Sequence, residues 1–492
     1  MAEPESTLPI PPALPPAPIE RVNDFPDRLS PMLVKELRQG LRSQTFVILF
    51  LVLQGLLALV LLTAGPIAAS NDSASGATGD IVSKIVFCLY GLGVLVVQPL
   101  RGISAVATEI KQNTIDLMVL TRLSAWRIVW GKWCSIVSQS ALIVLAVLPY
   151  LILRYFFGGM QLFAELTLMI YLFVVSGALT AFTVGLSAIG SVLIRGLVVV
   201  GGAAFMVVYV PFYFTPSLGT FVDILSFNTR NDTFAALGVL ALAVYSGYFF
   251  LEVGATAIAP AAENRATRKR LIGLTVVVAS YLLLGFVDFN HALYAALVVA
   301  WLISLDLFTE RAEFPSIVCR PFLRWGGASR LAGRLLYPGW ASGTLFFILL
   351  MGVIALLIFL TTPTDSEQYT RAAIGFGSMV FPAAIIQVFA RNTPNRFSVY
   401  LSLSIVCALL TAILSVLYFS VKEELLLWIF SFIPMVLFPV SGELSSGTNQ
   451  DTIFFISVAT TGTYLLIVLA GALPKIRRIS RLEEEALAGI EN

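Results

Sequence analysis

The sequence predicts an all-α, polytopic integral membrane protein with about 12–13 transmembrane helices. Hydrophobic residues make up 58% of the 492-residue chain and charged residues only 12%, whereas about a quarter of the residues of a soluble domain are charged. Apolar runs long enough to cross about 30 Å of hydrocarbon recur from Phe46 almost to Pro474. Helices are expected, because a span must satisfy its own backbone hydrogen bonds and the runs lack the alternation of barrel strands.

The amino-terminal segment is expected to contain a disordered tail and a short helix before the first span. Residues 1–29 are rich in proline and lack the apolar core of a signal peptide, so a disordered cytoplasmic tail is expected. The Ser30-Pro31 pair is typical of a helix start, and the next residues place apolar and polar side chains on opposite faces. This pattern predicts an interfacial surface helix, with a basic stop-transfer flank as the alternative. Its charged residues are Lys35, Glu36, Arg38 and Arg42.

The apolar runs divide the chain into two membrane regions, residues 30–262 and 263–474, followed by a charged tail at 475–492. The first region is expected to hold six spans, at 46–64, 81–100, 128–153, 162–189, 196–214 and 234–260. The second holds seven apolar runs, at 271–289, 292–308, 343–360, 372–389, 399–419, 425–440 and 452–473. Thirteen crossings would put the basic tail outside, so one run is expected not to cross, either 425–440 or one of the 271–308 pair.

The distribution of Lys and Arg predicts the orientation. If the amino terminus is cytoplasmic, the outer loops of the first region hold only Lys84, Arg154 and Arg230. The inner loops hold Arg28, Lys35, Arg38, Arg42, Arg101, Lys111, Arg122, Arg127, Lys132, Arg195, Arg265, Arg268, Lys269 and Arg270. This strong positive-inside bias predicts a multi-pass protein of the cytoplasmic (inner) membrane, with its amino terminus and the segment 109–132 in the cytoplasm.

The segment 109–132 is longer and more structured than a loop between two spans needs to be. Asn113 is expected to cap a helix whose third position is Asp116, a variant of the capping box worth about 1 kcal/mol. The residues that follow are almost continuously apolar from 115 to 120, so spans, lipid or another protein must cover them. Ser124 is expected to cap the next helix.

This segment resembles one in the permeases of type-2 ATP-binding-cassette (ABC) exporters. In that family an acidic residue, a Gly-Thr pair, an acidic residue, a leucine run, a Thr-Pro-Leu-Ser turn and an Ile-x-x-Gly-Lys stretch follow one another. The matching positions here are Glu109, Thr114, Asp116, Leu117 to Leu120, Thr121, Leu123, Ser124, Ile128, Gly131 and Lys132. Asn113 stands where glycine is usual, and Arg122 where proline is usual. With the surface helix and the segment LSAIGSVLIRGLVVV, the resemblance covers roughly residues 30–260.

The resemblance implies a coupling helix that sits in a groove of an ATPase. It assigns this coupling to Glu109, Asn113, Thr114, Asp116, Leu117, Leu120 and Ser124. No GxxxxGK[ST] phosphate loop occurs in the sequence, so ATP and its hydrolysis are expected on a separate cytoplasmic ATPase subunit, with neither cofactor nor enzymatic activity in this chain. A six-span module supplies half of a pathway, which implies a homodimer or heterodimer of permeases unless the second region replaces a partner.

Other functions of a membrane protein require acidic or metal-binding residues within or beside the spans. Glu252, in the sixth span, is expected either to lie on an intramembrane pathway or to be paired within the bundle. An ion-coupled secondary transporter needs more acids near the midplane, and a membrane enzyme needs more than the lone His291 and scattered carboxylates. A non-transporting scaffold or sensor remains an alternative. The partners expected are the ATPase, permease subunits and membrane lipid, and no nucleic acid.

Overall fold

The fold is helical throughout the part of the chain that the structure describes. The computed structural model describes residues 31–70, 75–113, 123–155, 162–191, 195–196, 199–201, 225, 227, 229–260, 262–324, 327–363, 365–393, 395–421, 425–439, 441 and 448–491. No strand occurs in these ranges, which confirms the predicted all-α class for them. The predicted tail at 1–29, the coupling residues 114–122 and nearly all of the predicted fifth span lie outside them.

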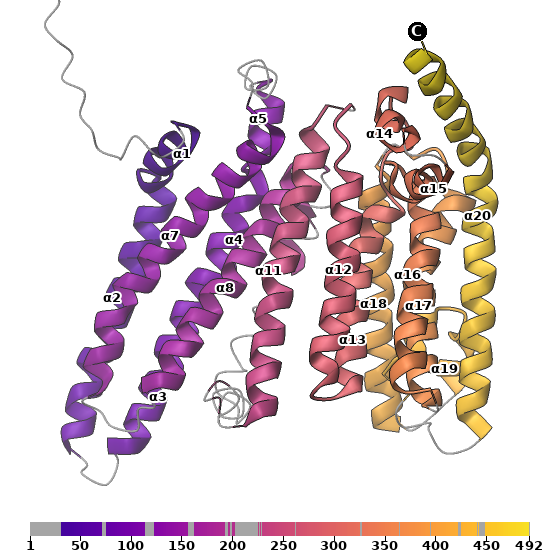
Figure 1. The fold of residues 1–492 in the computed structure, drawn as a ribbon. Coiled ribbons are helices and arrows are strands. Elements are labelled where there is room, and N and C mark those ends of the chain that lie inside the picture. The colour runs from indigo at the N-terminus through magenta and orange to yellow at the C-terminus, as the bar shows by residue number, and fades with distance from the viewer. Residues whose placement is uncertain are drawn as a thin grey trace, which may run out of the picture.

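The first region forms a short surface helix and a set of long helices that stand side by side (Figure 1). A π-helical turn and a 3₁₀ turn interrupt the second long rod on either side of α4. The elements are α1 (Pro31–Leu41), α2 (Gln44–Ser70), α3 (Ser75–Gly91), η2 (Leu92–Val97), α4 (Gln98–Arg101), η3 (Gly102–Ser104), α5 (Ala107–Lys111), α7 (Ala125–Arg154), α8 (Leu162–Ser187) and α11 (Arg230–Ile258).

The second region continues the row beyond α11 (Figure 1). Its elements are α12 (Ala266–Gly285), α13 (Phe289–Leu307), η5 (Ser316–Cys319), α14 (Arg320–Leu323), α15 (Gly327–Leu336), α16 (Trp340–Thr361), α17 (Ser366–Phe389), α18 (Arg396–Val421), α19 (Leu425–Ile429), η6 (Pro434–Leu437) and α20 (Thr448–Glu491). One buried apolar cluster joins α8 and α11 to α12, α13, α16, α17, α18 and α20, so the two regions share a core.

Ten helices among the described residues are long and apolar enough to span a bilayer, the architecture of a polytopic helical membrane protein. Helix α12 is not among them, because Arg268, Lys269 and Arg270 occupy its first turns, yet it packs along α13. Both candidates for a non-crossing run are absent from the ten: the described part of the run at 425–440 contains only the short helices α19 and η6, and α12 belongs to the 271–308 pair.

Several short helices gather at one end of the bundle. Figure 1 places α1, α5, α14, α15 and the carboxyl end of α20 at this end, which we call the α1 end. The charged tail predicted at 475–492 continues α20 as a helix up to Glu491. Buried Glu483 pins this extension to α15, through ion pairs of 2.7 Å with Arg330 and 3.0 Å with Arg334.

Small residues set the closest helix contact in the first region. Gly185 of α8 and Gly254 of α11 bring the two backbones together, since a Cβ on Gly254 would lie 2.8 Å from the Gly185 Cα and a Cβ on Gly185 would collide with the Phe250 carbonyl oxygen. Spans without a hydrophobic driving force between them use such small residues to gain van der Waals contact.

We expect Gly185→Leu to lower the free energy of unfolding by about 1–3 kcal/mol or more, because the backbone of α11 cannot move aside as a side chain would. Thermal unfolding of the purified protein in detergent measures the effect. Gly55→Leu on α2 is the matched control, because a Cβ on Gly55 meets no atom within 4 Å. Equal melting temperatures for the two variants would contradict the close contact.

Candidate functional site

A buried lysine joins three elements of the first region at the α1 end. The Lys132 Nζ of α7 lies 3.2 Å from Glu36 Oε1 of α1 and 3.1 Å from Glu109 Oε1 of α5, and all three side chains are less than one-sixth exposed. Ser135, one turn along α7, donates a 2.9 Å hydrogen bond to the Glu36 carbonyl. We call Glu36, Glu109, Lys132 and Ser135 the Lys132 cluster. One cation thereby lies between two acids and links α1 and α5 to α7.

Further polar contacts brace the same elements. The Arg101 guanidinium at the end of α4 donates to Ser43 Oγ at 2.9 Å, to Gln98 Oε1 at 3.1 Å and to Gln139 Oε1 of α7. The Val106 N–H, at the start of α5, donates to Ser187 Oγ at the end of α8 with a 3.1 Å bond. The base of the predicted coupling segment is therefore held by α1, α4, α7 and α8 together.

The two ends of the predicted coupling segment take defined conformations. Asn113 has a φ of 55° and its N–H donates to the Ile110 carbonyl, so it closes α5 in a left-handed conformation instead of the extended one of a helix N-cap. The predicted N-cap role of Asn113 is corrected accordingly. Asparagine and glycine both tolerate the left-handed conformation, so Asn113 suits this position. Ser124 caps α7 as predicted, by accepting the Arg127 N–H.

The other predicted site residues divide into two groups. Thr114, Asp116, Leu117 and Leu120 lie outside the described residues. Lys35 and Arg38 of α1 and Arg42 just beyond its end are exposed, whereas Glu36 points inward to Lys132. Side chains of one helix thus serve two purposes, an exposed basic face and a single buried acid.

Glu252 of α11 is fully buried and ion-paired. Its Oε2 lies 3.0 Å from Arg265 Nη1 and its Oε1 lies 3.5 Å from Arg268 Nη1, while the Tyr248 hydroxyl donates to Oε1 at 3.2 Å. The Arg268 guanidinium also lies over the rings of Tyr248 and Trp126, which links α12 to α7. This geometry matches the second of the two expectations for Glu252, pairing within the bundle near the end of its span.

A second charged layer fastens α12 and α13 to the connection between α15 and α16. Lys269 Nζ lies 2.6 Å from Asp306 and 3.4 Å from Glu310, and Arg270 Nη2 lies 3.0 Å from Glu310. Arg270, wholly buried, also donates to the carbonyls of Leu335, Tyr337 and Gly339 and to the Ser342 hydroxyl. We call Lys269, Arg270, Asp306 and Glu310 the α12 charge layer.

A backbone N–H and two cations stabilise the Glu310 carboxylate, which follows the end of α13. Gly339, with a φ of 107°, turns its N–H toward Glu310 Oε2 at 2.9 Å. Burial alone would raise the pKa of the Glu310 carboxyl, but Lys269, Arg270 and this N–H outweigh burial and hold the pKa below its ordinary value. The carboxylate is thus kept ionised between two cations.

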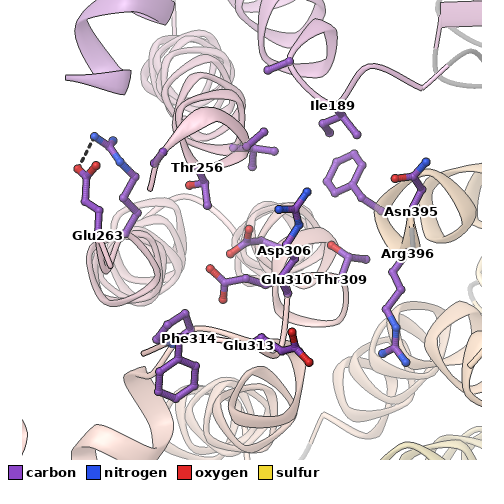
Figure 2. A pocket seen from close by; sticks show the side chains of 18 of the residues that line it. Ile189, Thr256, Glu263, Asp306, Thr309, Glu310, Glu313, Phe314, Asn395 and Arg396 are labelled. Carbon is purple, nitrogen blue, oxygen red and sulfur yellow. Dashed lines mark ion pairs between the residues drawn. The ribbon is translucent and has the colours of Figure 1, made fainter. Parts of the chain in front are cut away.

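A cavity of about 250 Å³ lies beside the α12 charge layer, where the two regions meet. Figure 2 shows Ile189 of the first region near Asn395 and Arg396 of the second, with Asp306 and Glu310 to one side of them. Cavities that enclose drug-sized ligands measure roughly 300–1,000 Å³, so this one is too small for a large cargo in the conformation described. Its acids Glu263, Asp306, Glu310 and Glu313 are all engaged in ion pairs.

Sequence reasoning placed Lys269 and Arg270 among exposed loop cations and so missed the α12 charge layer. A usable signal was present: Asp306 and Glu310 are four residues apart at the end of one helix, opposite three consecutive cations at the start of the previous one. Among the described residues no three His, Cys, Asp or Glu side chains converge as metal ligands would. The chemistry of both clusters is the pairing of buried charges.

Removal of the central cation should destabilise the Lys132 cluster. We expect Lys132→Met to lower the free energy of unfolding by about 3–5 kcal/mol, because Glu36 and Glu109, both largely shielded from water, would lose the cation that lies between them. Lys132→Arg should retain most of the stability. Thermal unfolding measures both variants, and the triple variant with Glu36→Gln and Glu109→Gln should recover stability relative to Lys132→Met. No recovery would show that the acids are not the cause.

The low pKa of Glu310 predicts a pH-dependent contribution to stability. Because the folded pKa lies below the unfolded value of about 4.3, the contribution is present above that pH and is lost as the pH falls through the folded pKa. We expect Glu310→Gln to unfold at a lower temperature than wild type at pH 7, and the gap to shrink below about pH 4. Glu313→Gln, at an exposed ion pair of the same loop, should show neither effect. A gap that stays constant with pH would refute the ionised Glu310.

Comparison with protein-family models, with curated proteins and with solved structures finds no match to this chain. The functional interpretation therefore depends on its own residues. The Lys132 cluster, the α12 charge layer and the cavity between the two regions all lie at or near the α1 end of the bundle, the end at which the sequence predicts a docking segment.

Proposed function

We propose that this chain is the permease subunit of an ABC exporter of the cytoplasmic membrane, driven by a separate ATPase that docks on residues 109–124. Under this proposal the α1 end faces the cytoplasm, and the cargo crosses along the helices of a permease dimer. ATP-driven closure of two ATPases would push the docking segments, and the spans would tilt between inward-open and outward-open arrangements. The chain supplies the moving part, and its partner supplies nucleotide chemistry.

The single observation that carries the proposal is the bridge from Lys132 to Glu36 and Glu109. A segment that receives a push is useful only if its base is stiffly joined to the helices that must move. Glu109 stands at that base, and the bridge joins it to a spanning helix and to the surface helix. The bonds from Arg101 and Val106 add α4 and α8. A loop that merely connected two spans would not need such bracing.

The second region supports an asymmetric chain with one docking segment. At the α1 end, the connection from Phe389 to Arg396 between α17 and α18 is too short for a second coupling helix, and the longer connection between α13 and α16 folds into η5, α14 and α15, which pack on α20. One chain thus offers one site for one ATPase, and two ATPases require two permease chains. We propose a dimer for this reason, with the second region as an added support packed on α11.

The acids of the bundle argue against ion coupling as the rival function. Glu252 and Asp306 are buried, but each is paired with a cation and stands within two turns of the end of its helix. A coupling ion needs a carboxylate that can be exposed to both sides from near the midplane. A non-transporting scaffold or sensor could carry the same docking segment and bind the same ATPase. ATPase binding alone does not separate it from an exporter, so an ATP-dependent movement of the helices must be measured as well.

Charge reversal within the docking segment should abolish ATPase binding. We expect Asp116→Arg to insert into the membrane normally and to lose an ATPase that copurifies with wild type. The measurement is affinity purification from native membranes in mild detergent, with mass spectrometry to find a polypeptide that contains a phosphate loop. Glu313→Arg is the matched control, because Glu313 is an exposed acid of another loop.

Two outcomes would contradict the proposal. One is wild-type protein that brings down no phosphate-loop protein, and the other is Asp116→Arg that still brings it down. A scaffold and an exporter are separated by a second readout, the ATP-dependent change in a spin-label distance between the docking segment and α11. ATPase binding without any such change would favour the scaffold.

A further inference from the structure

An apolar groove runs between α16 and α20, at a depth where both helices are expected to be in hydrocarbon. Its volume is about 480 Å³, its walls are residues 348–358 of α16 and 454–465 of α20, and its floor is α17. The two walls touch at the α1 end, where Trp340 and Ala341 meet Ala472. The groove opens beyond this contact, toward the opposite end of the bundle.

Small residues on all three helices create the space. A Cβ on Gly352 of α16 or on Gly462 of α20 would meet no atom within 4 Å. Ala355 and Ala372 continue the small surface along one wall and the floor. The hydroxyl of Thr461 is not free for a ligand, because it donates to the Ala373 carbonyl at 3.0 Å. The groove therefore presents hydrocarbon surface to its occupant.

We propose that this groove is a binding site for a single acyl chain of a membrane lipid. A cavity lined by apolar side chains does not hold water, and no soluble ligand reaches hydrocarbon depth. A helix of another subunit is too large, since ten residues of helix fill a cylinder of about 1,200 Å³. A groove of about 480 Å³ bounded by three helices has room for one extended acyl chain.

A chain in the groove differs from the lipid that coats every span. Three walls contact it instead of one, so it gains more dispersion contacts than a chain on an open helix face. Its contact with the floor is diagnostic, because Ala372 and Phe376 of α17, each only 5% exposed, line the groove. The proposal concerns binding and does not depend on export.

The experiment uses the full chain in phosphatidylcholine nanodiscs that contain a small fraction of phosphatidylcholine with a diazirine in its acyl chain. After irradiation, mass spectrometry maps the labelled peptides. We expect label on the floor peptide that contains Ala372 and Phe376, and we expect Gly352→Leu with Gly462→Leu to reduce it about tenfold by filling the groove. Gly55→Leu on α2, which also points into open space, should leave the floor label unchanged.

Folding is monitored in parallel by thermal unfolding, which the open space at both glycines should leave near the wild-type value. The single variants Gly352→Leu and Gly462→Leu provide the same test should the double variant fold poorly. A floor that is unlabelled in wild type, or equally labelled in the filled variants, would overturn the proposal. Cross-links between two chains through the groove would overturn it as well, in favour of a second copy.

Discussion

The cost of charge in a medium of low dielectric constant governs how the α1 end is built. An unpaired ion costs several kcal/mol there, and the loss of one partner leaves that cost uncompensated. Lys132, Lys269 and Arg270 are buried, and each has two acids, or an acid and several carbonyls, within reach. These three cations thereby hold together helices that are distant in the sequence.

These cations belong to the set of Lys and Arg residues from which the sequence predicts the orientation. Lys and Arg near the cytoplasmic ends of spans set the topology, and here some of them also serve as structural ties. Lys132 connects surface helix, α5 and α7, whereas Lys269 and Arg270 connect α12, α13 and the turn before α16. Each half of the chain has a short surface helix whose charged side chains pair with a long helix, α1 with α7 and α15 with α20.

Stiffness at this end gives the proposed coupling a physical basis. A push on residues 114–122 would pass first to Glu109 and Ser124, which flank them, and then through Lys132 and Arg101 to the spans. The cavity between the two regions lies at this same end and is small in the conformation described. Farther from the α1 end, the second region also contains a glycine-lined apolar groove.

Much of the fold could be predicted from local patterns. Long apolar runs predicted the spans, the Pro-bearing run at 425–440 was recognised as a candidate that does not cross, and Ser124 was recognised as a cap. Partners were harder to predict, because an ion pair such as Lys132 with Glu36 joins residues 96 positions apart. Asn113 was assigned to the wrong end of a helix, since asparagine suits both an N-cap and a left-handed turn.

By itself, the sequence determined that this protein is a bundle of apolar helices with its cations concentrated at one end. Composition and the spacing of apolar residues are local properties, so they can be read without knowing which helices are neighbours. Only the tertiary structure decided which cation pairs with which acid and where glycines leave a groove open. It also decided that Glu252 pairs with Arg265 and Arg268. The reason is that these features depend on how helices cross, and burial turns a charge that looks solvated in the sequence into a tie between distant segments.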